Sequence, residues 1–239
     1  MGWIYMSIDK EFQIMQLSDS FFPSGMFSMS GGLESMFHQK VITNSNQVYN
    51  FILEQIEFQL IPCDCNVLII TMNAVKDNDI SLILDIDKKF YSMKLTKDLR
   101  NSVVRSGKQI FNCLMYMIDV NNKKINFLNQ LKNKIENNET PCTYPVSFGI
   151  YSQIFEIPIT SAIKTMLYSF SSSIVSAAIR LGIIQHLDAQ KILGTLAEPV
   201  NGFVSKKINE KTTDIWQFTP LTEIHQMYHE HNESRMFIT

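Results

Sequence analysis

The chain has 239 residues, of which 45% are hydrophobic and 11% aromatic, enough apolar material to fill a folded core. Its 21 basic and 23 acidic residues give a formal net charge of -2, which excludes a strong electrostatic attraction to nucleic acid or to an anionic membrane. Apolar runs such as 67–70 and 174–184 are shorter than the ~20 residues of a membrane span or are interrupted by charge, and residues 1–10 lack a secretory signal pattern. We therefore expect a globular cytoplasmic protein with no nucleic acid and no membrane among its partners.

Apolar residues at three- and four-residue spacing predict helices along most of the chain. Polar caps at 44–46 precede a helix with apolar positions from Val48 to Leu60, and the same spacing predicts helices over 80–95 and from about Thr96 to Met117. No pair of alternating strands joined by a hairpin turn is visible in the pattern. The sequence predicts an all-α fold, a single-domain helical bundle of about ten helices.

The second half of the chain begins with a polar region and ends with a polar tail. Residues 121–141 are rich in Asn and Lys with a thin apolar stripe, which favours a lightly buried helix pair or a mobile lobe. Pro158 is placed to open a long helix that runs through Ile179. We expect one helical domain over 1–219 and a C-terminal docking tail over 220–239.

Four cysteines in a chain of this size indicate reduced thiols rather than a disulfide framework. Cys63 and Cys65 could offer two sulfurs to a soft metal, but no second Cys or His pair follows at the spacing of a zinc site. The sequence favours a buried helix that starts after Pro62 over a metal site.

The segment QLSDSFFPSGMFSMSGGLESM, residues 16–36, fits neither a helix nor a strand over most of its length. Gly25 and Gly32 permit backbone angles that a side chain resists, so we expect a turn followed by a helix from about Leu33. Its aromatic residues either pack into the core or form an interface, and core packing is favoured for Phe22 and Phe27.

The same segment matches no catalytic template. The glycine spacings of a nucleophile elbow, of a phosphate loop and of a dinucleotide site are all missing. No His or Asp can be placed beside Ser28 or Ser30, so a hydrolase is not supported. We expect a protein that is not an enzyme and has no cofactor.

The C-terminal segment MYHEHNESRMF, residues 227–237, combines histidines with apolar anchors. In a helix, His225 and His229 would share a face as metal ligands do, with His231 close by. A polar terminal segment with Met227 and Phe237 as anchors is more typical of a docking peptide, and that interpretation is favoured. A nickel-binding metallochaperone that uses these histidines is the alternative.

Arg180 lies among small residues, Ser176 to Ala178, which allow another helix to approach closely. A lone Arg in that setting needs a carboxylate or carbonyl partner. We expect Arg180 to face a dimer interface or a partner protein.

Four blocks in the same order resemble the UreF family of urease accessory proteins. The first resembles L-Q-L-x-x-x-x-L-P-x-G-G-F-S-x-S-x-G-L-E, and a second, at 98–107, resembles E-L-R-x-x-S-x-x-x-G. The third is a series of matches within 145–181, at 145–146, 148–149, 157–158, 168–169 and 175–181, and the fourth resembles M-R-H-E-x-Q-Y-S-R-L-F at 227–237. The chain departs from the family at Met26, Met29 and Glu233, and after Leu181.

This resemblance implies a helical, non-catalytic scaffold for nickel delivery to urease, without a metal site of its own. It implies that the partners are UreD (UreH in some organisms), the GTPase UreG and apo-urease, that the chain forms a homodimer, and that UreD binds the tail. The residues that the resemblance assigns to partner binding, together with Arg180, are Pro23, Gly25, Phe27, Ser28, Ser30, Gly32, Glu34, Met227, His229, Glu230, Ser234, Arg235 and Phe237.

Overall fold

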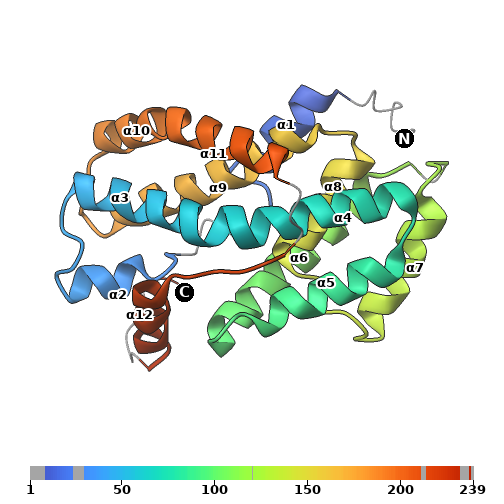
Figure 1. The fold of residues 1–239 in the computed structure, drawn as a ribbon, viewed down its shortest axis with the longest axis horizontal. Helices are drawn as coiled ribbons and strands as arrows, with labels where there is room; N and C mark the ends of the chain where they lie inside the picture. The colour runs from blue at the N-terminus through green and yellow to red at the C-terminus, as the bar shows by residue number, and fades with distance from the viewer. Residues whose placement is uncertain (1–8, 24–29, 120, 211–213, 232–236, 238–239) are drawn as a thin grey trace.

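The computed structural model describes residues 9–23, 30–119, 121–210, 214–231 and 237, and within these ranges every regular element is a helix (Figure 1). The prediction of an all-α, single-domain bundle is confirmed. The helices are α1 (Lys10–Ser18), α2 (Leu33–His38), α3 (Ser45–Gln55), a π-helical segment (Ile56–Asp64), α4 (Cys65–Asp77), α5 (Ile80–Ser92), α6 (Lys97–Met117), α7 (Ile125–Glu136), α8 (Tyr144–Ile154), α9 (Ile159–Arg180), α10 (His186–Thr195), α11 (Ala197–Asn209) and α12 (Pro220–His231).

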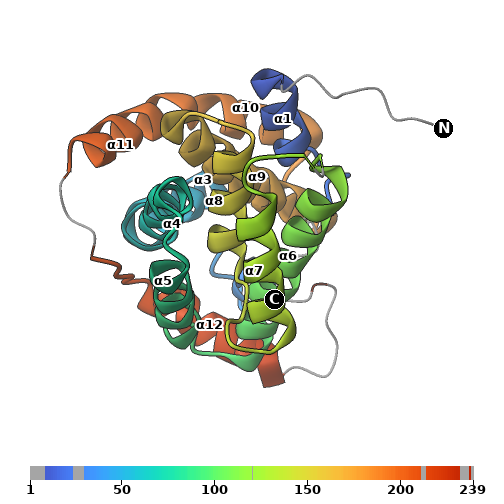
Figure 2. The ribbon, with the colours of Figure 1, turned by 90° about the vertical axis from the view of Figure 1, so that its right-hand side faces the viewer.

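The core is built around α8, which is buried on nearly all sides. It packs against α4, α6 and α9, and the view along the long axis shows it in the interior among them (Figure 2). A second layer forms where α9 contacts α1, α10 and α11. A helix that is apolar all round must be covered on every side, so α8 determines where its neighbours pack.

Several helix starts follow from local sequence. Asn44 caps α3 by accepting a hydrogen bond from the Gln47 amide, and Thr96 caps α6 in the same way through Leu99. Pro158 is the N-cap of α9, as its position in the sequence predicts. These boundaries are set by side chains within one turn of the helix, which is why the sequence could locate them.

The expected helix start after Pro62 is wrong, because the helix runs through this residue without interruption. From α3 through α4 the chain forms one helical rod, and Pro62 lies inside its π-helical segment. Proline has no N–H to bond the carbonyl four residues earlier, and a π-helical turn relaxes the spacing that its ring would otherwise violate.

Two helical runs, 45–77 and 159–180, are long and apolar enough to cross a membrane by length and composition alone. Their most apolar windows are 67% and 61% buried inside the fold, which is typical of core helices of a globular protein.

The polar region 121–141 contains one helix rather than a helix pair or a mobile lobe. The apolar stripe of α7 is buried, with Phe127, Leu128 and Leu131 packed into the core. Three apolar residues on one face are enough to dock a helix whose other faces are polar.

A buried carboxylate fixes the loop that joins α7 to α8. Asp87 accepts hydrogen bonds from the Cys142 amide at 2.6 Å and the Thr143 amide at 2.9 Å, and from the hydroxyls of Thr140 and Thr143. On the other side of the same loop, a side chain at Gly107 would overlap the Cys142 carbonyl oxygen. The loop is therefore held between α5 and α6.

Candidate docking surface

The chain crosses the π-helical segment after α11 in an extended strap, residues 214–219. The Phe218 amide donates to the Phe58 carbonyl at 2.9 Å, and the Trp216 amide donates to the Pro62 carbonyl at 3.3 Å. Because Pro62 offers no N–H to the Phe58 carbonyl, this oxygen is available to the strap. The attachment point of the strap therefore lies at the turn that contains Pro62, about 160 positions earlier in the chain.

Side chains add to this attachment. Asn66 donates through Nδ2 to the Pro62 carbonyl at 2.9 Å and to the Asp214 carbonyl at 2.7 Å. One buried amide group thus joins the start of the strap to the first turn of α4.

A buried lysine holds the middle of the strap. Lys94 is 1% exposed, lies 4.1 Å from the centre of the Phe90 ring, and donates through Nζ to Gln217 Oε1 at 3.0 Å. Its Nζ is 3.9 Å from Asp64 Oδ2, and burial raises the pKa of this carboxyl group while Lys94 opposes the rise. Gln217 also donates to Glu223 of α12, so the polar contacts continue from the core into the last helix.

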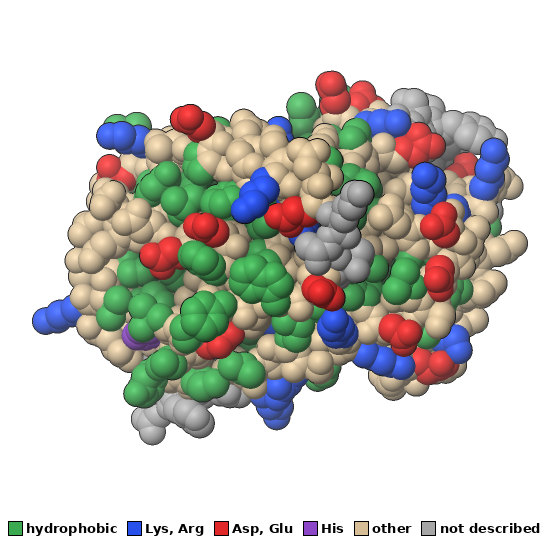
Figure 3. Space-filling model, viewed as in Figure 1, with side chains coloured by type: hydrophobic (Ala, Val, Ile, Leu, Met, Phe, Trp, Pro, Cys, Tyr) green, Lys and Arg blue, Asp and Glu red, His purple; other side chains and the backbone are tan. Residues whose placement is uncertain are grey.

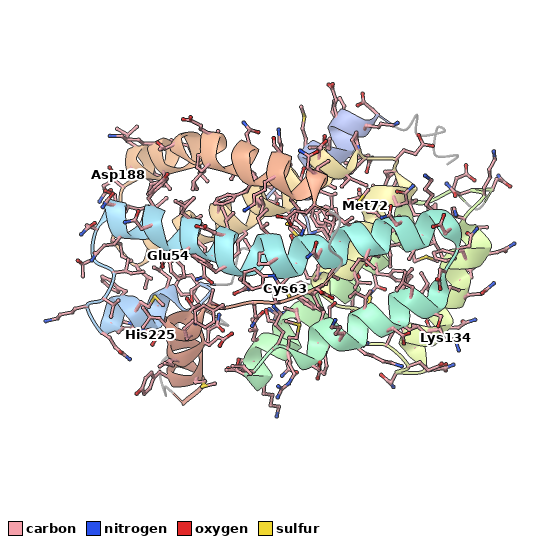
Figure 4. All side chains as sticks on the ribbon, viewed as in Figure 1. Glu54, Cys63, Met72, Lys134, Asp188 and His225 are labelled. Carbon is pink, nitrogen blue, oxygen red and sulfur yellow. The ribbon has the colours of Figure 1, made fainter. Side chains whose placement is uncertain are left out.

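The helix α12 makes buried polar contacts with the end of α3 and with α2. Gln55 donates through Nε2 to Thr222 Oγ1 at 2.8 Å, and Ser35 Oγ lies 3.3 Å from His225 Nδ1. Figure 4 shows His225 on the α2 side of α12. Burial lowers the pKa of His225, because the charged imidazolium is the form that loses solvation.

Two glycines precede α2 and lie beside α12. Gly32 has φ of 95°, and a Cβ there would lie 3.4 Å from Gln226 Cγ and 3.5 Å from the Thr222 carbonyl oxygen. Gln226 in turn donates through Nε2 to the Gly31 carbonyl at 3.4 Å. Glycine is required at position 32 mainly by its left-handed backbone conformation.

Near the C-terminus, Phe237 returns to α2 and α9. Its amide donates to Glu34 Oε2 at 3.2 Å, and its buried ring lies 4.2 Å from Arg180 Cζ. Arg180 also donates through Nε to the Ser176 carbonyl at 3.4 Å. The contact between guanidinium and ring is a cation–π interaction, which links the end of α9 to the end of the chain.

The strap and α12 leave an exposed apolar surface beside α3. A cavity of about 490 Å³ opens between these elements, and Figure 3 shows apolar side chains gathered over this part of the molecule. We call its exposed apolar rim the apolar face. The apolar face consists of Val41, Phe58, Phe218 and Leu221. Large apolar side chains exposed around one cavity are typical of a protein-docking surface.

The structure brings some of the predicted partner-binding residues together. Glu34, Arg180 and Phe237 meet at α2 and the end of α9, whereas Gly32 lies against α12 and Ser30 is buried two residues before it in the sequence. Arg180 has the carbonyl contact that its setting requires.

Other predicted residues lie apart or outside the described ranges. Pro23 is exposed in the turn after α1, and Met227 is exposed on α12. His229 and Glu230 lie on α12, and only their backbone is described. The residues outside the described part of the chain are Gly25, Phe27, Ser28, Ser234 and Arg235.

Core packing of Phe22 is confirmed, since its ring is buried and contacts Tyr151 edge-on with 5.7 Å between ring centres. Phe27 lies outside the described residues. The neighbouring Phe21 is exposed.

Of the residues proposed for metal binding, Cys63, Cys65 and His225 have described side chains, and those of His229 and His231 lie outside the description. Among the described residues, no group of three or more His, Cys, Asp or Glu side chains could hold a metal ion. Cys63 and Cys65 are buried, and burial raises the pKa of Cys63 to about 12, which opposes formation of the thiolate that binds metals.

The sequence patterns did not reveal the strap or the apolar face. The signal that could have indicated the strap is Pro62 within an otherwise regular helical pattern, because a proline there leaves a carbonyl for another segment. The partner segment itself carries no local pattern that identifies it.

A wholly helical fold with an apolar face built partly from its own C-terminal segment defines a helical protein with a candidate protein-docking surface. The UreF family model matches residues 42–197, more than half of the chain. The chain therefore belongs to the UreF family.

Relatives match over nearly the full length. The urease accessory protein UreF of Trichodesmium erythraeum is 26% identical over 234 residues, covering 98% of this chain and 99% of that protein. The urease accessory protein UreF 1 of Brucella melitensis is 27% identical and covers 98% of this chain and 95% of that protein. The UreF of Photorhabdus laumondii is 25% identical, with coverage of 94% and 96%.

Proposed function

We propose that this chain acts in urease maturation as a non-catalytic scaffold in the cytoplasm. It holds UreD (UreH in some organisms) and the GTPase UreG in register for nickel delivery to apo-urease, and it works as a homodimer. Membership of a family whose relatives are named urease accessory proteins supports the role in maturation. The individual partners, the route of nickel and the dimer belong to the proposal.

The observation that carries the proposal is the apolar face. Phe218 and Leu221 are 68% and 54% exposed at the junction of the strap and α12, beside a cavity walled by α3. Burying such side chains against a partner would gain about 1.5–3 kcal/mol for each fully covered residue. We assign the UreD contact to this face and to the tail from Pro220 onward.

The alternative, a nickel metallochaperone, requires His225 to act together with His229 or His231. His225 is buried against Ser35, so it would have to leave this contact to bind nickel. Because nickel binding would break the contact between His225 and Ser35, the structure favours the scaffold over the metallochaperone.

The test is a pull-down of purified UreD and UreG with three forms of the chain: full length, a chain ending at Thr219, and Leu221→Asp. Leu187→Asp is the matched control, because Leu187 is an 85% exposed leucine on α10, away from the apolar face. We expect the full-length chain and Leu187→Asp to retain UreD, and the truncated chain and Leu221→Asp to lose it.

Equal binding by all forms would remove the tail and the apolar face from the proposal. If no form binds either partner, and calorimetry shows that the full-length chain alone binds Ni(II) and the truncated chain does not, the metallochaperone takes the place of the scaffold. Sedimentation over a range of concentrations tests the homodimer.

A further inference from the structure

A second surface feature lies on different elements from the apolar face. A groove of about 700 Å³ runs between α5 and α6 and is closed by the loop after α7. Lys134, at this end of the molecule, is labelled in Figure 4. We call the groove between α5 and α6 the basic groove. Its lining residues used below are Lys88, Arg105, Lys108, Gln109, Asn112 and Glu139.

The basic groove carries an excess of positive charge in a chain whose formal net charge is -2. Lys88 comes from α5, and Arg105 and Lys108 come from neighbouring turns of α6. Among the described residues, none of these three cations forms an ion pair.

The one acidic residue in the lining, Glu139, is already paired with a lysine. Glu139 accepts a hydrogen bond from Lys134 at 2.8 Å, and this bond lowers the pKa of Glu139. Lys88 also lies close enough to Glu139 to lower its pKa, so Arg105 and Lys108 are the two cations that face the groove without a counter-charge from its lining. Grooves lined by one sign of charge attract ligands of the opposite sign.

The walls of the basic groove are fixed relative to each other. Lys88 directly follows Asp87, whose carboxylate holds the loop at 140–143. Arg105 and Lys108 flank Gly107, where α6 touches the same loop at Cys142. A preformed groove binds its ligand without the cost of ordering its own walls, so this rigidity favours binding.

The shape and lining of the groove indicate the kind of ligand. Along α6 the lining runs from Asn101 to Asn112, a length of about 16 Å at ~1.5 Å per residue, which matches roughly five residues of extended peptide. Side-chain amides such as Gln109 and Asn112 can bond to a peptide backbone, while the cations bind carboxylates. Cations on both walls, followed along α6 by side-chain amides, suit an extended segment that offers carboxylates and backbone groups together.

We propose that the basic groove binds an acidic, extended segment of a partner protein. The groove shares no lining residue with the cavity of the apolar face, so this interaction is independent of the UreD contact proposed above.

The test uses fluorescence anisotropy of fluorescein-labelled hexaglutamate titrated with the full-length chain. The decisive variant is Arg105→Glu with Lys108→Glu. The matched control is Lys191→Glu with Lys206→Glu, which reverses two exposed charges on α10 and α11. We expect the groove variant to weaken binding by about tenfold or more and the control to change it less than about twofold, with weaker binding in high salt.

Loss of binding in both double variants alike would overturn the proposal, as would no binding by the native chain. If inorganic phosphate displaces the labelled hexaglutamate when both are present at the same total concentration of negative charge, the groove is a site for small anions. Equal or tighter binding of labelled hexathymidylate would assign it to nucleic acid. Thermal unfolding of each variant checks folding, and Arg105→Gln with Lys108→Gln replaces the charge reversal if that variant does not fold.

Discussion

At the residue scale, we expect one added carbon atom at Gly107 to lower the stability of the fold strongly. A methyl group there would overlap the backbone carbonyl of Cys142, and backbone cannot move aside as a flexible side chain can. We expect Gly107→Ala to lower the free energy of unfolding by about 3 kcal/mol or more, measured by urea denaturation. Gly194→Ala is the control, because Gly194 lies in α10 with open space around it and Ala favours the helix.

An unchanged urea midpoint for Gly107→Ala would show that α6 can move away from the loop without cost. In that case the rigid walls assigned to the basic groove would also be wrong.

His225 gives the chain an expected dependence on pH. Burial lowers its pKa in the folded state below the ordinary value of 6.5, so the unfolded state binds a proton first as the pH falls. The contribution of His225 is therefore present above about pH 6.5 and is lost on acidification. We expect the native chain to lose more stability than His225→Gln between pH 7.5 and 5.5, measured as the free energy of unfolding by urea denaturation. Parallel pH curves for the two proteins would contradict this.

At the element scale, the strap depends on Pro62. Replacing this residue with Ala gives the helix an N–H four positions after Phe58, which competes with the Phe218 amide for the same carbonyl. We expect Pro62→Ala to speed hydrogen exchange at Phe218 by about tenfold while the rod formed by α3 and α4 remains helical.

The control for the strap is Pro158→Ala, at the exposed N-cap of α9, which should leave exchange at Phe218 unchanged. If Pro62→Ala also leaves it unchanged, the strap is held by Lys94 and Asn66 and not by the proline.

Elements with local signals could be predicted from the sequence, and elements fixed by distant contacts could not. Asn44 and Thr96 lie within one turn of the helices that they cap, so the sequence alone could predict where these helices begin. Pro62 was misread because its effect depends on Trp216 and Phe218, which lie far along the chain. A local pattern shows that a carbonyl lacks a partner, but it does not show which segment supplies one.

At the scale of the whole molecule, we expect the helices before the strap to fold without α12 and Phe237. The core helix α8 contacts α4, α6 and α9, none of which belongs to the C-terminal segment. We expect a chain ending at Thr219 to stay helical and to unfold at a temperature lower by about 5–10 °C, for a loss of ~2–3 kcal/mol. Circular dichroism during heating measures the helical content and the unfolding temperature. If the truncated chain does not unfold cooperatively, α12 is part of the core.

The candidate site was predictable only in part at this scale. Sequence blocks near both ends of the chain resemble one family, and the structure joins them where Phe237 contacts Glu34 and Arg180. The apolar face and the basic groove were not predicted. Both arise where separate segments converge, at Phe58 with Phe218 and at Lys88 and Arg105 with Glu139.

The contact between Phe237 and Glu34 spans 203 positions, which has a consequence for the order of events during synthesis. At about 5–20 residues per second, the ribosome makes Phe237 about 10–40 s after Glu34. The helices that form the core can assemble earlier, so the surface of α2 that later receives His225 and Phe237 is exposed on the nascent chain. A partner that reaches α2 in this interval meets it before the chain's own tail covers it.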